Sequence, residues 1–190
     1  MLDMIRIHRG RFSSISGLIR PSLESNHHQK EPMSKNLPAF DRNERNILRT
    51  LQLDGRLSNV ELARKIGLSE SPCLRRVKKL EESGVIAGYA ALLDRRRLGL
   101  DVMAFVQVTL DKQKHADPAR FLAKVADEAH IIECHAMSGG YDYLLKVVAR
   151  SIEHFSELCM EHILRYPGVS NVESSFSLRE FKSSRGLPLP

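Results

Sequence analysis

The sequence lacks the features of several protein classes. No stretch of its 190 residues approaches the roughly 18 consecutive apolar residues of a membrane-spanning helix, so no membrane association is expected. It has only three cysteines, Cys73, Cys134 and Cys159, an odd number without C-x-x-C spacing. Because disulfide frameworks belong to oxidising compartments, these cysteines are interpreted as reduced, mostly buried thiols of a cytoplasmic protein.

Motifs of catalysis and of metal binding are also missing. There is no Gly-rich phosphate loop, no G-x-S-x-G and no carboxylate pair that the pattern places together, so neither a cofactor nor a catalytic residue is expected. Glu133, Cys134 and His135 are adjacent, but successive strand residues point to opposite faces. Cys159 and His162 share a helical face without further ligands at matching spacing. The sequence therefore predicts no metal site.

What the sequence does contain is a segment with helix-turn-helix spacing, SNVELARKIGLSESPCLRRVKKLEESG, which starts at Ser58. Ser58 and Glu61 form a capping box for a first helix, and Gly67 is suited to the left-handed position that ends it. Ser69 then follows as the N-cap of a second helix. Two short helices joined by a tight turn predict a helix-turn-helix.

The second of these helices is densely basic. Cys73, Val77 and Leu80 recur at helical spacing and are expected to pack inward, which leaves the cations outside. Residues 37–100 hold 13 Lys and Arg against 8 Asp and Glu, whereas residues 101–190 hold 10 against 12. An ordinary solvated helix face is the alternative, but positive charge concentrated on this segment favours binding to double-stranded DNA. The residues expected to contact DNA are Asn59, Ser69, Ser71, Pro72, Arg75, Arg76, Lys78 and Lys79.

The flanking segments complete a DNA-binding domain at residues 37–93. A capped helix is expected from Asp41 to Leu53, and a short two-stranded wing from Val85 to Leu93 around Gly88. Residues 1–36 are interpreted as a disordered extension, or as the result of a start assigned upstream of Met33. Residues 94–100 are a linker whose three arginines either touch the DNA backbone or keep the linker solvated.

From residue 101 the pattern changes from helical to alternating. Strands are expected at 101–110, 131–137, 141–149 and 169–181, with one helix capped by Asp117 and another by Ser151. The order β-α-β-β-α-β predicts a ferredoxin-like domain at 101–182, followed by a tail at 183–190. Both helices would cover one sheet face and leave Met103 and Phe105 on the other, which predicts a homodimer. The fold class is therefore α+β.

This combination resembles the Lrp/AsnC (feast/famine) transcriptional regulators over residues 37–190. FDRNERNILRTLQLDGRLSNVELARKIGLS is similar to the family's first two helices, SPCLRRVKKLEESGVIAGY to its recognition helix and wing, and MSGGYDYLLKV to its second hairpin. The resemblance implies dimers that assemble into tetramers or octamers. It also implies an amino acid, or a related small acid, as effector near that hairpin. The effector-binding residues so implied are Met137, Ser138, Gly139, Gly140, Asp142 and Tyr143.

Two alternatives stay open at this stage. Gly139-Gly140 either cradles the carboxylate of an effector or forms a tight hairpin turn, and Gly140 stands where many family members have an acidic residue. Some proteins with the same two domains resemble sirohaem decarboxylases, which use histidines in the second domain, and His115, His130 and His135 allow that interpretation. The four intact cations of the second helix favour a regulator of amino-acid metabolism that is not an enzyme.

Overall fold

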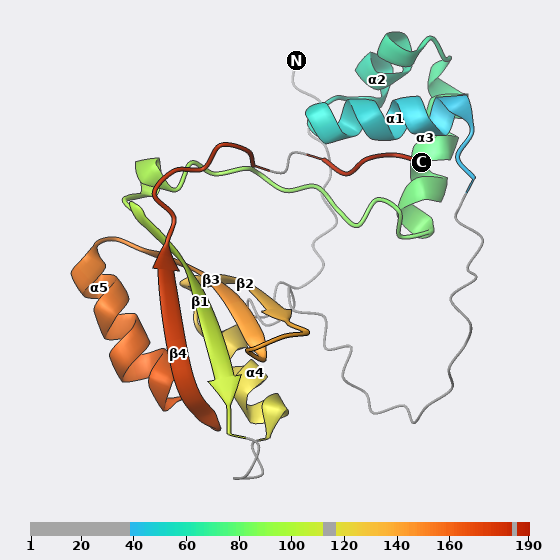
Figure 1. Cartoon of the computed structure of the whole chain (residues 1–190). Helices are drawn as coiled ribbons and strands as arrows, with labels where there is room; N and C mark the ends of the chain where they lie inside the picture. The colour runs from blue at the N-terminus through green and yellow to red at the C-terminus, as the bar shows by residue number, and fades with distance from the viewer. Residues whose placement is uncertain (1–38, 112–116, 184–185) are drawn as a thin grey trace, which may run out of the picture. The chain divides into compact units, whose positions relative to one another are not determined.

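The computed structural model describes residues 39–111, 117–183 and 186–190, which form two compact units (Figure 1). One unit contains Asp94–Arg179, and the other contains the helices before Leu93 together with Glu180–Pro190. The expectation for residues 1–36 falls outside the described residues. No helix within the described ranges is long and apolar enough to cross a membrane.

Three helices make up the first unit: α1 (Arg42–Leu53), α2 (Asn59–Ile66) and α3 (Glu70–Glu82). Both predicted capping boxes are formed, by Asp41 with Glu44 and by Ser58 with Glu61. Ser69 is the N-cap of α3, as expected, but its side chain makes no capping hydrogen bond. The predicted helix-turn-helix is confirmed.

The core of this unit is small and lies between the three helices. Gly67 ends α2 with φ 72°, a left-handed conformation that glycine adopts without steric strain. The chain therefore turns at once into α3. The inward positions predicted from helical spacing are confirmed, and the buried apolar residues are Ile47, Leu48, Leu62, Ala63, Cys73, Val77 and Leu80.

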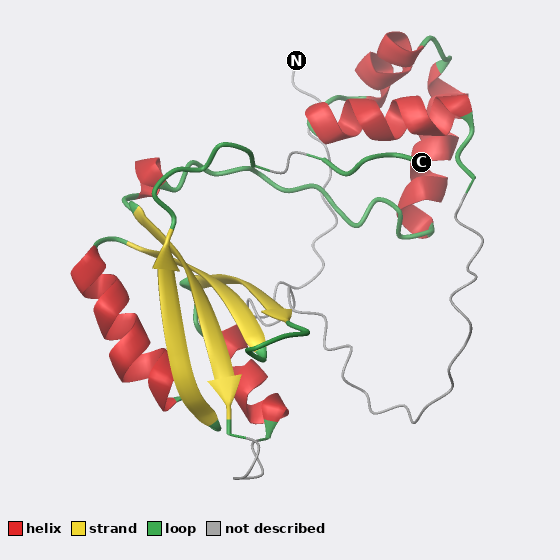
Figure 2. Cartoon of the chain, viewed as in Figure 1, coloured by secondary structure: helices red, strands yellow, loops and turns green. Residues whose placement is uncertain are grey.

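The two strands expected in the wing are not formed in this structure. No described residue between Gly84 and Leu93 belongs to a strand, and this segment is loop in Figure 2. Its start is bonded to α3 instead: the Ile86 amide donates to the Leu80 carbonyl at 3.0 Å, and the Tyr89 hydroxyl donates to Glu81 at 3.0 Å. An isolated pair of strands is at best marginally stable, and this one would have little apolar surface to bury.

The C-terminal end packs on α1. Leu189 contacts the helical core, and the Gln52 side chain bonds to both the carbonyl and the amide of Leu187. Nη1 of Arg45 donates to the carbonyl of Pro190 at 3.4 Å. The last five residues therefore form part of the helical unit, although they are distant from it in the sequence.

The second unit is built in the order β1 (Val102–Leu110), α4 (Pro118–Asp127), β2 (Ile131–Ala136), β3 (Tyr143–Ala149), a second helical segment and β4 (Val169–Phe176). A 3-10 turn, η2 (Arg96–Leu98), precedes it. The strands form one antiparallel sheet in the order β2-β3-β1-β4. The predicted ferredoxin-like arrangement is confirmed.

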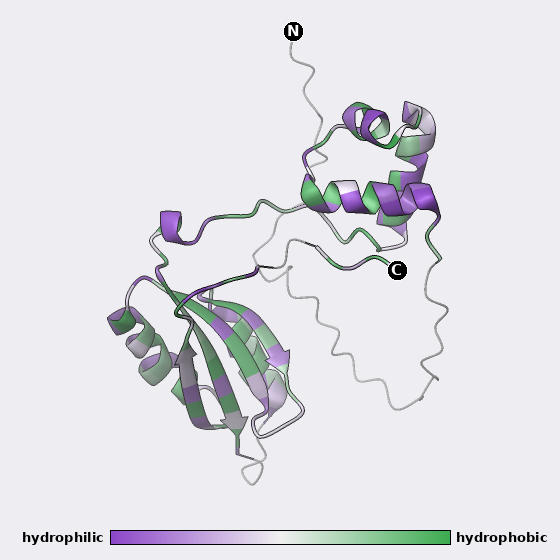
Figure 3. Cartoon of the chain, turned by 45° about the horizontal axis from the view of Figure 1, so that its top comes forward, coloured by the Kyte–Doolittle hydropathy of each residue, from purple (hydrophilic) through white to green (hydrophobic). Residues whose placement is uncertain are grey.

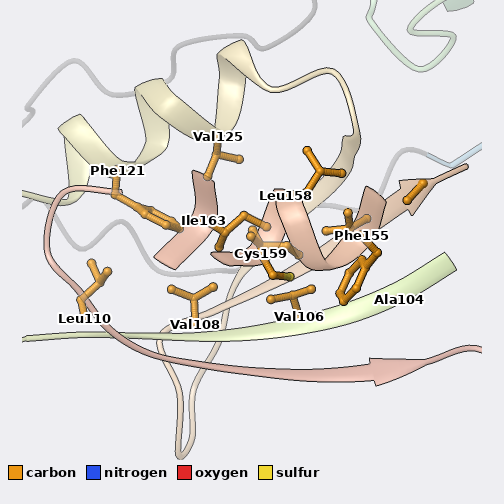
Figure 4. Close-up of a cluster of buried hydrophobic side chains, with 13 residues drawn as sticks. Ala104, Val106, Val108, Leu110, Phe121, Val125, Phe155, Leu158, Cys159 and Ile163 are labelled. Carbon is orange, nitrogen blue, oxygen red and sulfur yellow. The ribbon is translucent and has the colours of Figure 1, made fainter. Parts of the chain in front are cut away.

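Both helical segments cover the same sheet face. Figure 4 shows Phe121 and Val125 of α4 beside Phe155, Leu158 and Ile163, above the side chains of β1. In β1 every second residue from Ala104 to Leu110 is buried in this core, and the changes of hydropathy along the strands appear as bands of colour in Figure 3. Alternation with a period of two is what places one row of each strand in this core.

Two expected elements differ in extent. The helix capped by Ser151 is α5 (Ile152–Glu157) and then continues as π and 3-10 turns, η3 (Leu158–His162) and η4 (Ile163–Arg165). The fourth strand ends at Phe176 rather than at residue 181, because Phe176 pairs with Ala104 and β1 begins only two residues earlier. Beyond Phe176 the Ser177 amide still donates to the Met103 carbonyl at 2.8 Å, near the start of β1, and the next residue, Leu178, is 95% exposed.

Candidate DNA-binding face and effector site

The outer face of α3 presents the predicted DNA-binding side chains. Ser71, Arg75, Lys78 and Lys79 are exposed, whereas Pro72 and Arg76 are half-buried. Several of them line a shallow hollow of about 660 Å³ on the helix surface. The predicted set is therefore brought together on one helix, apart from Asn59 and Ser69 at the N-terminal ends of α2 and α3.

A network of charges joins α3 to the start of α1. Nη1 of Arg76 donates to Oδ2 of Asp41, and Nζ of Lys79 lies 3.1 Å from Oε1 of Glu44. Glu44 has only 8% of its side chain exposed, and its other oxygen accepts from the Asp41 amide at 3.1 Å. The hydrogen bond that the Glu44 amide donates to Asp41 lowers the pKa of Asp41, and Arg76 lowers it further, despite the opposing effect of desolvation. The network therefore orients Arg76 and Lys79 of α3 without any contact to DNA.

The two remaining cations of α3 are differently placed. Within the described ranges, Arg75 and Lys78 form no ion pair, and both are exposed. Arg64 of α2, which was not among the predicted residues, is also exposed and lines a second hollow with Ser69 and Ser71. Its outward position on α2 was the available signal, because Leu62 and Ala63 are on the buried side.

The arginines of the linker do not act alike. Nη1 of Arg95 donates to the carbonyls of Leu100 and Asp101, both at 2.7 Å, and so folds back on the chain. Arg97 lies 3.8 Å from Asp94, with its side chain largely exposed. Arg95 therefore has a local structural role.

In the second unit, residues 137–142 connect β2 to β3. Oδ2 of Asp142 accepts from the Leu110 amide at 2.8 Å, and the Asp142 amide donates to the Val108 carbonyl at 2.9 Å. Its carbonyl accepts from the Met137 amide at 2.9 Å. Asp142 thus ties the loop to the end of β1, and its carboxylate already has a backbone partner.

Gly139 and Gly140 do not form a tight turn. The connection has six residues, since Ala136 pairs with Tyr143, and neither glycine has a positive φ. A Cβ added at either position would meet no atom within 4 Å. Neither backbone conformation nor packing within the described residues requires glycine here.

A hollow of about 240 Å³ opens beside this loop, on the sheet face away from the helices. Gly140 and Tyr141 line it together with side chains of β1 and β4 that the sequence did not single out: Gln107, Thr109, Asn171 and Glu173. Sheet register supplies the reason, because Gln107 lies opposite Glu173 and Thr109 opposite Asn171.

The other predicted effector residues do not line the hollow. Met137 and Ser138 are exposed on the loop. Tyr143 packs its ring on Phe121, with centroids 4.8 Å apart, and burial raises its pKa. Tyr143 therefore contributes to the core rather than to the hollow.

Two of the three histidines of the enzyme alternative, His130 and His135, lie within the described residues and have separate acidic partners. His115 lies outside the described residues. Nδ1 of His130 lies 2.9 Å from Glu128, whereas Nε2 of His135 lies 3.4 Å from Glu133. Among the described residues there is no group of three side chains that could hold a metal ion.

Comparison with known proteins identifies the family. Residues 103–187 match the Lrp/AsnC ligand-binding domain, and residues 40–87 match a winged helix-turn-helix DNA-binding domain. The leucine-responsive regulatory protein of Salmonella typhimurium is 43% identical over 148 residues, which are 78% of this chain and 90% of that protein. The chain belongs to the Lrp/AsnC family.

Two such structures were solved with an amino acid. A Neisseria meningitidis regulator in complex with L-methionine matches with a TM-score of 0.75 and 39% identity, over 79% of this chain and 97% of the other. The feast or famine regulatory protein of Mycobacterium tuberculosis, complexed with L-methionine, matches with a TM-score of 0.71 and 30% identity, over 78% and 99%. This Lrp/AsnC member is thus a DNA-binding transcriptional regulator by family.

Proposed function

We propose that the protein binds operator DNA through α3 and responds to an amino acid or a related small acid at the loop between β2 and β3, to control amino-acid metabolism. The observation that carries the DNA-binding role is the exposure of Arg75 and Lys78 on the helix after the turn, where neither forms an ion pair with a described residue. In helix-turn-helix proteins the N-terminal part of this helix meets base edges.

The predicted DNA-binding residues divide into those that contact bases, those that contact phosphates and those that hold α3 in place. Ser71, Pro72 and Arg75 lie in the N-terminal half of α3, which suits contact with base edges in the major groove. Lys78 and Asn59 suit contacts with phosphates, as does Arg64. Arg76 and Lys79 are held by Asp41 and Glu44, so they hold α3 in place as well as adding positive charge.

Oligomerisation follows from the sheet face that the helices leave uncovered. Phe105 is 38% exposed there, whereas Met103 is only 5% exposed. The neighbouring positions toward the hairpin loop are the polar Gln107 and Thr109. A homodimer through the apolar end of this face, with higher assemblies built from dimers, would set the spacing of two α3 helices.

A regulator, rather than an enzyme, is the favoured class because the curated relatives are named as regulatory proteins and α3 keeps all four cations. The test is competition binding to the DNA upstream of the gene. The full chain should prefer this DNA over random duplex by at least about a thousandfold, the lower end for specific binders. Equal affinity for both DNAs would overturn the proposed function.

A further inference from the structure

The hollow beside the hairpin loop has a single charged side chain in its lining, and that side chain is acidic. Glu173 of β4 lines it with Gln107, Thr109 and Asn171, which are neutral and polar. Nδ2 of Asn171 donates to Oε1 of Glu173 at 3.2 Å and orients the carboxylate. A lining of this kind suits a cationic group with several hydrogen-bond donors, such as an ammonium.

The carboxylate of Asp142, in the loop itself, already has a hydrogen-bond partner in the protein. Oδ2 of Asp142 accepts the backbone N–H of Leu110, which closes the end of β1 against the loop. Asp142 is also absent from the lining of the hollow. Of Asp142 and Glu173, Glu173 is therefore the carboxylate that lines the hollow and is available to a ligand.

The two glycines provide an independent observation at the same place. Nothing in the described chain accounts for a missing Cβ at Gly139 or Gly140, and Gly140 lines the hollow. Glycine without a conformational or packing reason is suited to close approach of a ligand to the backbone. Backbone N–H groups at such a place can bind a carboxylate.

We infer that Glu173 is the specificity-determining residue of the effector site: its carboxylate binds the ammonium group of an α-amino acid whose carboxylate lies against the Gly139-Gly140 backbone. This inference rests on the proposed function and deepens it by naming the ligand class, a zwitterion. It excludes the corresponding hydroxy acids and keto acids, which lack the ammonium group.

The test measures binding of two probes to the full chain by calorimetry: L-methionine and its 2-hydroxy analogue, which replaces the ammonium by a hydroxyl. The natural protein should bind L-methionine and prefer it at least about tenfold, which is the effect of a charge-assisted hydrogen bond. Glu173→Gln should lose this preference. Glu157→Gln, which removes an exposed charge from the helical side of the same unit, should keep it.

A second variant separates ligand contact from folding. Gly140→Ala should leave the thermal midpoint unchanged or slightly raised, since open space surrounds it, yet weaken L-methionine binding. Unchanged L-methionine binding by Glu173→Gln would overturn the inference, as would loss of binding in Asp142→Asn alone. If the natural protein binds neither probe, the inference fails, while operator binding by the same sample decides the regulator function separately.

Discussion

At the scale of single residues, Glu44 links the first helix to the DNA-binding helix. Its carboxylate accepts a hydrogen bond from the Asp41 amide, which completes the capping box of α1, and another from Nζ of Lys79 in α3. The side chain has little exposure to water. Glu44→Ala should destabilise the helical unit by about 1–3 kcal/mol, because the cap bond is lost and Lys79 loses its partner. Thermal unfolding of the full chain measures the effect. Glu82→Gln, which removes an exposed charge from α3, should leave the midpoint within error; equal midpoints for both variants would contradict this role.

Arg75 and Lys78 should differ in what they contribute to DNA binding. Arg75→Ala should weaken operator binding by about 1–3 kcal/mol if the contact is bidentate to guanine, with a smaller effect on random DNA. Lys78→Ala should weaken both DNAs alike and reduce the slope of affinity against salt by about one. Titrations on both DNAs at several salt concentrations compare them. Equal losses on both DNAs for Arg75→Ala would rule out base reading by that side chain.

Local patterns were predictable from the sequence, and distant partners were not. The capping pairs of Ser58 and Asp41 were found because each bond spans only three residues. The bond between Arg76 and Asp41 joins residues 35 apart, and it forms only because the fold brings α1 and α3 together. Glu173 was likewise missed, since only sheet register places β4 beside the hairpin loop.

At the scale of elements, the C-terminal segment acts as part of the helical core. Leu189→Ala should lower the midpoint of the helical unit, because Leu189 covers apolar residues of the core. Leu178→Ala is the matched control, since that side chain is almost fully exposed and should change nothing. The comparison needs thermal unfolding of the two full-length variants. Equal midpoints would show that the segment does not stabilise the helices.

The second unit has its own link between elements. Glu128, just after α4, lies 2.9 Å from Nδ1 of His130 and 3.1 Å from Nδ1 of His162 in η3. Burial by itself would raise the pKa of Glu128, but the hydrogen bonds from His130 and His162 outweigh it and lower the pKa. Because the folded pKa lies below the unfolded one, Glu128 stabilises the fold above about pH 4.5, and this contribution disappears as pH falls through the folded value.

Glu128→Gln should therefore lower stability at pH 6 and have less effect at pH 3, where the natural protein has lost part of the contribution because the pH is below 4.5. Denaturant unfolding of both proteins at the two pH values measures the difference. Glu157→Gln again serves as a control because it is exposed. A destabilisation of the same size at both pH values would show that the carboxylate charge of Glu128 has no such effect.

Sequence patterns located the strands of the second unit but did not predict every strand end or the structure of the wing. Alternation located all four strands, yet the fourth was expected to continue past Phe176, since a pattern does not show where the paired neighbour ends. The wing was predicted from a glycine between two apolar runs, but such runs form strands only when a surface is available to bury them.

For the whole molecule, DNA affinity should depend on dimerisation through the open sheet face. Phe105→Asp places a charge at the apolar end of that face and should yield monomers. Operator affinity should then fall at least about a hundredfold, because the second α3 no longer binds as an intramolecular event. Light scattering and operator titration of the same sample measure both effects. A monomeric variant with natural affinity would refute the dimer-based mechanism.

Reading of a specific operator by α3, under the control of an amino acid, can be measured by footprinting. The full chain is footprinted on the DNA upstream of its gene, with and without L-methionine or L-leucine. We expect protected half-sites separated by about 10 bp or multiples of it, with occupancy that changes when the amino acid is added. Uniform protection without a repeat, unchanged by any amino acid, would contradict it.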